Sequence, residues 1–143
     1  MKNKKILSIF FIILYLFFCK NIFADEFYFE TPEILAFENG NLLKALKGGK
    51  AQTDNGVEII ANEFEYNKKT NVLEATGNVK ITDEINKMIL NGEKVIYYKN
   101  DEKFYSINAT ATTENKLEII ADNIDYNKKT NVLEATGNVK ITD

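Results

Sequence analysis

Residues 58–83, EIIANEFEYNKKTNVLEATGNVKITD, return almost unchanged sixty residues later as EIIADNIDYNKKTNVLEATGNVKITD at residues 118–143. The two copies are identical at 22 of 26 positions. A repeat of fixed period indicates a structural unit that stacks on its neighbours. The sequence therefore predicts a repetitive architecture in which each copy is one part of a stack.

The second half of each copy alternates between apolar and polar residues. In the first copy, one parity holds Leu73, Ala75, Gly77, Val79 and Ile81, whereas the residues between them are polar. This period of two is typical of a half-buried β-strand, because a helix would scatter the same residues around its circumference. The glycine inside the strand favours a bend, or the close approach of another backbone.

The first half of each copy predicts a second strand with an irregularity. Ile59 has one parity, whereas Phe64 and Tyr66 have the other. A bulge or kink near residues 62–63 would reconcile the two parities by re-aiming the side chains that follow. Residues 67–71 are polar and turn-prone, so the predicted unit is a strand, a short turn and a strand.

The rest of the chain fits the same unit. Residues 84–116 repeat the parity change, from Met88 to Val95, and residues 33–53 form a divergent copy. The true period is therefore about thirty residues, with four copies. No stretch after residue 24 has helical apolar spacing, so we expect an all-β fold of eight or so antiparallel strands and almost no helix. Such strands must close, sandwich or coil to bury one face each.

The first 24 residues have the features of a signal peptide. A basic start is followed by an apolar run at residues 6–18 and by Ala24, where a signal peptidase could cut. The run is shorter than the roughly 20 residues that span a bilayer as a helix. We therefore expect residues 1–24 to be removed and residues 25–143 to form one exported domain. Lipid attachment at Cys19 is disfavoured by bulky Phe18 before it.

The composition excludes several kinds of chemistry. The chain has no histidine and no arginine, and its one cysteine lies in the expected signal peptide. Nucleophile systems and metal sites that use histidine or cysteine are therefore excluded from the exported part. Aspartate and glutamate occupy predicted turns and solvent-facing strand positions, which gives no clustered acid/base pair. We expect no enzyme activity, no metal and no cofactor.

The charge balance argues against nucleic acid as a partner. Four of the 18 lysines lie in the first 24 residues, whereas all 21 acidic residues follow, which leaves a net charge of −7 after cleavage. Nothing in this remainder forms a concentrated basic patch that could neutralise phosphates.

The doubled pattern Ile59-x-Ala61, Tyr66-Asn67 and Leu73-x-Ala75-x-Gly77-Asn78-Val79-x-Ile81 resembles the OstA-like family. That family includes the periplasmic lipopolysaccharide-transport bridge protein LptA and the N-terminal periplasmic domain of LptD. The resemblance covers essentially the whole chain after the signal peptide, weakly before Gly56. It implies a semi-open β-jelly roll, a V-shaped stack of antiparallel strands.

The resemblance also implies a function and a set of site residues. The implied function is to shelter lipopolysaccharide acyl chains, the lipid A part, in an apolar groove between the inner and outer membranes of a Gram-negative bacterium. The implied location is the periplasm, with possible outer-membrane association, and Lys80 and Lys140 could neutralise phosphates as point charges. The implied groove residues are Leu73, Ala75, Val79, Ile81, Leu133, Ala135, Val139 and Ile141, with Phe64, Tyr66, Val95, Tyr97, Ile124 and Tyr126 as further candidates.

Family members join end to end by strand addition, so the implied partners are further copies or other lipopolysaccharide-transport proteins of the two membranes. The last unit ends at Asp143 without a cap, and an unpaired edge is a template for another strand. A bridge protein and the N-terminal domain of the outer-membrane barrel protein both remain open.

Several other interpretations compete with this one. The apolar stripe could be a dry core that binds nothing, since every half-buried strand needs such a stripe. A structural or adhesive exported β-repeat protein and an exported hydrolase that uses carboxylates are the alternatives from other functional classes.

Overall fold

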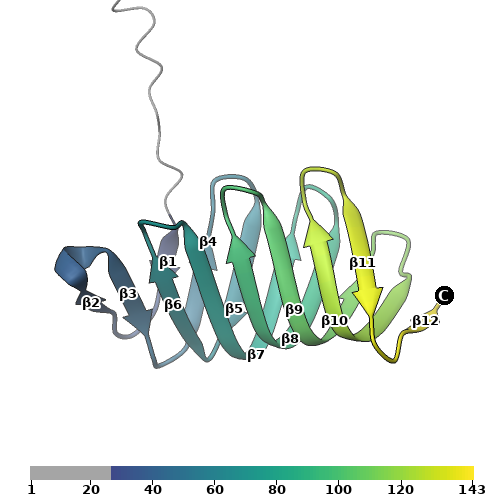
Figure 1. Cartoon of the computed structure of the whole chain (residues 1–143), viewed down its shortest axis with the longest axis horizontal. Helices are drawn as coiled ribbons and strands as arrows, with labels where there is room; N and C mark the ends of the chain where they lie inside the picture. Colours follow the sequence, from purple (N-terminus) through teal and green to yellow (C-terminus); the bar gives the residue numbers. More distant parts are fainter. Residues whose placement is uncertain (1–26) are drawn as a thin grey trace, which may run out of the picture.

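The computed structural model describes residues 27–143 as one coiled antiparallel sheet (Figure 1). The predicted signal peptide, residues 1–24, lies outside the described residues. The strands are β1 (Tyr28–Glu30), β2 (Leu35–Phe37), β3 (Leu42–Ala45), β4 (Gly49–Gln52), β5 (Val57–Ala61), β6 (Glu63–Asn67), β7 (Val72–Asp83), β8 (Met88–Tyr98), β9 (Lys103–Thr112), β10 (Glu118–Asn127), β11 (Val132–Thr136) and β12 (Lys140–Thr142).

The predicted all-β architecture is confirmed, although the number of strands is larger than expected. Within residues 27–143 the helical content is one short 3₁₀ turn, η1 (Glu38–Gly40). The excess over eight strands has two sources. Two of the repeat strands are each divided in two, as β5 with β6 and β11 with β12, and the divergent first copy contributes three short strands, β2 to β4, with β1 before it.

The long strands bend in the middle and so belong to two half-sheets. The first half of β7 pairs with β6 and its second half with β5, while β8 follows it on the other side. We call the half-sheet that contains β6 and β11 the front and the half-sheet that contains β5 and β12 the back, as Figure 1 shows them. The two half-sheets face each other like the arms of a V.

The bend is produced by a corner at which the backbone adopts the left-handed conformation. In β7, Gly77 and Asn78 lie opposite the single residue Glu93 of β8, and both have positive φ, 79° and 49°. The backbone N–H of Asn62 donates to the Gly77 carbonyl at 2.9 Å, and a Cβ on Gly77 would lie 2.7 Å from the Asn62 amide nitrogen. The predicted kink near residues 62–63 and the predicted close approach at the glycine are therefore one feature.

The corner recurs with the predicted period of thirty residues. Asn78, Asn108 and Asn138 all have positive φ, at 49°, 48° and 48°. Asparagine tolerates this conformation better than other residues with a Cβ, which explains its presence at each corner.

The hairpin turns lie at the opposite ends of the strands from the corner, and we call the space between the front and back turns the mouth of the V. In Figure 1 the turns of both half-sheets lie along the upper edge. The front turns are residues 68–71, 99–102 and 128–131, and the back turns are residues 53–56, 84–87 and 113–117.

Candidate functional site

The space between the two half-sheets is an apolar interior, and it holds ten of the fourteen sequence-predicted site residues. Each of these ten side chains is at most 5% exposed. Two come from the back half-sheet and the others from the front. They are Phe64, Tyr66, Leu73, Ala75, Val79, Ile81, Val95, Tyr97, Ile124 and Tyr126. In this structure they form one continuous core with their neighbours.

The four remaining predicted site residues belong to the second copy and lie at the end of the stack. Leu133 and Ala135 are partly buried against the core. Val139 is 43% exposed and Ile141 is 63% exposed. Their exposure results from their place at the end of the stack, because β11 and β12 each pair with β10 and, within residues 27–143, with no second strand.

The predicted phosphate contacts lie on the outer surface. Lys80 and Lys140 are exposed, and Lys80 has the opposite parity from its buried neighbours Val79 and Ile81. Their ammonium groups are therefore on the far side of the sheet from the apolar interior.

A column of aromatic rings lines the interior near the mouth. The rings of Tyr97 and Phe104 stack with centroids 4.1 Å apart and planes 2° apart, and Tyr126 continues the column 5.9 Å from Phe104. Phe27, just before β1, packs edge-on against Tyr66 at 4.8 Å. The ammonium of Lys99 lies 4.9 Å from the centre of the Phe27 ring, within cation–π distance. Because Phe27 precedes a back strand, its ring spans the two half-sheets.

A buried polar cluster crosses the mouth further along the stack. Asp83 ends β7 on the back half-sheet, and Lys128 follows β10 on the front. The Lys128 ammonium donates to Asp83 Oδ1 at 2.9 Å, and the two side chains are 4% and 1% exposed. The Tyr126 hydroxyl and the Asn86 amide each donate to Asp83 Oδ2 at 2.8 Å. We call these four residues the mouth clasp.

Hydrogen bonds to the turns complete the mouth clasp. The Asn86 amide also donates to the Lys128 carbonyl at 3.1 Å, which gives a second bond between the back and front turns. The backbone N–H groups of Ile85 and Asn86 donate to Asp83 Oδ1 at 3.1 and 3.2 Å. The carboxylate therefore accepts from five donors, which fixes the β7–β8 turn against the β10–β11 turn.

The contacts within the clasp shift the pKa values of Asp83 and Tyr126 in opposite directions. Burial alone would raise the pKa of Asp83, but hydrogen bonds from Lys128, Tyr126 and Asn86 outweigh it and hold that pKa below its usual value. Burial and the neighbouring Asp83 carboxylate raise the pKa of Tyr126. Asp83 is thus an anion at neutral pH and Tyr126 is a neutral donor.

Asp83 corrects the expectation that all carboxylates occupy turns or solvent-facing strand positions. It is 1% exposed because it shares the inward parity of Val79 and Ile81. The sequence contained this information, because the inward alternation of Val79 and Ile81 reaches Asp83 when it is continued by two residues. Its partner Lys128 lies in a turn, where no periodic pattern indicates which side chains are buried.

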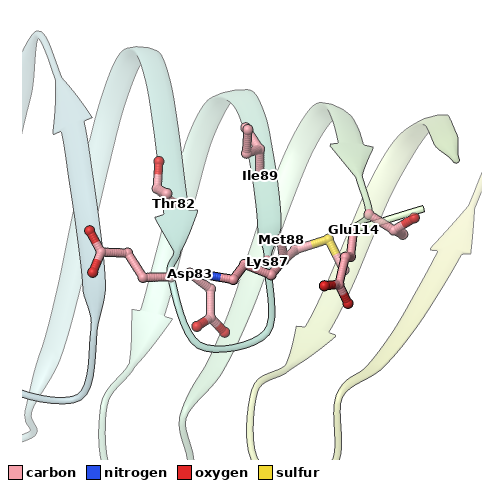
Figure 2. A pocket seen from close by; sticks show the side chains of 8 residues that line it. Thr82, Asp83, Lys87, Met88, Ile89 and Glu114 are labelled. Atoms are coloured by element: carbon pink, nitrogen blue, oxygen red, sulfur yellow. The ribbon is translucent and has the colours of Figure 1, made fainter. Parts of the chain in front are cut away.

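A cavity of about 560 Å³ lies beside the clasp, between the back turns β7–β8 and β9–β10. Figure 2 shows Lys87 and Met88 between Asp83 and Glu114. Its lining residues are Thr82, Asp83, Glu84, Lys87, Met88, Ile89, Thr113 and Glu114. Within residues 27–143 no group of three acidic, histidine or cysteine side chains is arranged to hold a metal ion. No helix in that range is long and apolar enough to cross a membrane.

Comparisons with known proteins agree with this geometry. Residues 58–143 match the sequence model of the family described as "LptA/(LptD N-terminal domain) LPS transport protein". Among solved structures, the chain is similar to LptH of Pseudomonas aeruginosa, described as the LptA-homologous periplasmic component of the lipopolysaccharide transport device. That match has a TM-score of 0.73 at 10% identity and covers 84% of this chain and 96% of the other, so it shows a shared fold. None of the curated protein sequences matches the chain.

Proposed function

This chain belongs to the LptA/LptD N-terminal-domain family of lipopolysaccharide-transport proteins, and we propose that it shelters lipopolysaccharide acyl chains between its two half-sheets. Proteins of this family are periplasmic, non-enzymatic carriers, so a role in lipopolysaccharide transport follows from membership. The finer proposal concerns where the lipid lies and how the stack is extended.

The observation that carries the proposal is the continuous apolar interior, which reaches an exposed end at β11 and β12. Val79 and Ile81 are buried inside it, whereas their equivalents Val139 and Ile141 are exposed at its end. An acyl chain in water costs about 0.8 kcal/mol for each CH₂ group, so even partial shelter would lower the cost of moving a glycolipid between membranes. The fourteen predicted site residues remain the proposed lipid contacts.

The exposed edges support end-to-end assembly by strand addition. At one end, Val132, Val139 and Ile141 are between 43% and 63% exposed. At the other, Tyr28 and Phe37 are 59% and 45% exposed on β1 and β2, which also lie at an edge of the sheet. Unpaired strands with apolar side chains are templates for another strand. The proposed occupants are further copies of this chain or other lipopolysaccharide-transport proteins of the two membranes.

Two forms of this function are compatible with the family. The first is a periplasmic bridge protein, exported by a cleaved signal peptide at residues 1–24. The second is the N-terminal periplasmic domain of the outer-membrane barrel protein, because the family description names both kinds of protein. Both forms place the same interior in the path of the lipid.

Site-specific photo-crosslinking tests the proposed lipid contacts. A photoreactive amino acid at Val79 or Val139 should form adducts with lipopolysaccharide in cells that carry the transport system. The matched control is Lys80, which is the neighbour of Val79 and exposed on the outer surface. Adducts with partner proteins alone, or equal lipopolysaccharide labelling from Lys80, would count against an interior lipid site.

A further inference from the structure

The mouth of the V is closed in this structure, although the proposed lipid site lies inside it. We infer that the mouth clasp is a releasable latch, whose opening lets acyl chains pass between the half-sheets. This inference rests on the proposed function and adds a step to it. The interior side chains Leu73, Val79, Tyr97 and Ile124 are at most 2% exposed, so the closed form leaves them no contact with a ligand from outside.

The position of the clasp suits a latch. Asp83 and Lys128 are 45 residues apart in the chain and come from opposite half-sheets. The half-sheets are joined covalently through the corner, where Gly77 and Asn78 bend the strand, and they also pack through the apolar core. The contacts at the mouth join the two half-sheets at the strand ends that are farthest from that corner. Releasing them would let the arms separate most where a lipid must enter, with the smallest change at the corner.

The chemistry of the clasp also suits release. An apolar pair at the mouth would lose its stabilisation on exposure to water, because burial is what stabilises it. An ion pair behaves differently, since the desolvation cost of burying two charges offsets much of their attraction. When the mouth opens, water hydrates Asp83 and Lys128 in place of their mutual contact. The desolvation cost of burying the two charges is then regained. The clasp therefore combines a defined closed geometry with a modest penalty for opening.

The first lysine of the Asn-Lys-Lys-Thr turn is buried in one of the two copies and exposed in the other. Lys68 and Lys128 occupy the same position in identical Asn-Lys-Lys-Thr turns, yet Lys68 is exposed and Lys128 is 6% exposed. Asp143, the equivalent of Asp83, is exposed. The burial of Lys128 therefore depends on its pairing with Asp83 across the mouth, which is what a latch requires.

Locking the clasp tests the inference. In a Cys19→Ser background, Asp83→Cys and Lys128→Cys would be joined by a short bifunctional thiol reagent with a reducible spacer, with a photoreactive residue at Val79. Purified rough-type lipopolysaccharide is the probe. The locked protein should give roughly tenfold fewer lipid adducts, equivalent to about 1.4 kcal/mol, and reduction of the spacer should restore them.

A matched crosslink controls for the chemistry. Lys87→Cys and Glu114→Cys line the same cavity on two back turns, so joining them leaves the mouth free to open. This variant should label as well as the unlocked protein. Equal labelling of the clasp-locked protein would overturn the latch while leaving the proposed function intact. Absence of labelling from the unlocked protein would overturn the proposed interior site, and the latch with it.

A distance measurement keeps the test decisive if the cysteine pair prevents folding. Glu84 and Lys129 are exposed on the back and front turns next to the clasp, so spin labels there leave its four residues native. Lipopolysaccharide should lengthen the distance between the labels. An unchanged distance at saturating lipopolysaccharide, with adducts still formed from Val79, would overturn the latch.

Discussion

The two nearly identical copies, residues 58–83 and 118–143, have different environments. Ile81 is 2% exposed and its equivalent Ile141 is 63% exposed, and Val79 and Val139 differ in the same way. The first copy, which contains β5, β6 and β7, has strands on both sides, β3 and β4 on one and β8 on the other, whereas the last strands of the second copy have a neighbour on one side. Burial here is conferred by the adjacent unit, since the local sequence is the same.

The largest expected difference in unfolding free energy is between substitutions of Asp83 and of its equivalent in the second copy, Asp143. Asp83→Ala would leave Lys128 buried without its counter-ion, and removing one partner of a buried pair costs about 4 kcal/mol of unfolding free energy. Asp143→Ala removes an exposed carboxylate and should change nothing measurable. Urea denaturation of both variants checks this, and similar stabilities would show that the clasp contributes little to folding.

Substitutions of the equivalent residues Ile81 and Ile141 should differ somewhat less in their effect on the free energy of unfolding. Ile81→Ala leaves a cavity between the half-sheets and should lower the free energy of unfolding by about 3 kcal/mol. Ile141→Ala trims a side chain that is already mostly in water, so its effect should stay within about 0.5 kcal/mol. The same denaturation experiment measures both. A large loss at Ile141 in dilute, monomeric protein would contradict the role assigned to the neighbouring strand.

The corner glycines should give a smaller contrast. Gly77→Ala places a Cβ at φ 79° and against Asn62, which should cost about 2 kcal/mol. Gly137 has φ 77°, and a Cβ added there would lie even closer to the Asp122 side chain. Because β12 is a three-residue edge strand, it can shift or open locally without exposing the core. Gly137→Ala should therefore cost less, as measured by thermal unfolding, and equal costs would show that the edge is as rigid as the centre.

The smallest effect is the pH dependence of the clasp. The pKa of Asp83 is lower in the folded protein than in the unfolded chain, where it is about 3.9. Its stabilising contribution is therefore complete above that value and is lost as pH falls through the lower, folded-state pKa. The stability difference between the native protein and Asp83→Asn should be constant near neutral pH and shrink below about pH 4. Denaturation curves from pH 7 to pH 3 test this, and a difference independent of pH would be the contrary result.

The fold was largely predictable because it depends on the alternation of apolar and polar residues along each strand. The parity of Leu73, Ala75, Val79 and Ile81 predicted their inward direction, and the parity change after Ile59 predicted the corner. The number of strands was underestimated for two reasons. The corner divides some strands in two and only bends others, and residues 28–52 form four short strands.

The candidate site was less predictable because it depends on contacts between distant turns. Lys68 and Lys128 lie in identical local sequences, and only the meeting of the β7–β8 and β10–β11 turns buries the second one. The position of Phe27 inside the mouth depends in the same way on which front turn lies opposite β1. Period-two patterns report which face of a strand is buried, but they carry no information about closure between half-sheets.

The order of the strands in the sheet has a consequence for how the chain folds. From β7 to β11 each strand pairs with its successor, so this part of the sheet is a series of hairpins between consecutive strands. A stack of repeats joined in this way can begin to fold at any hairpin and grow outward. The central hairpins of β7, β8 and β9 can form before either end of the stack. The mouth clasp, which joins residues 45 positions apart, would then be among the last contacts to form.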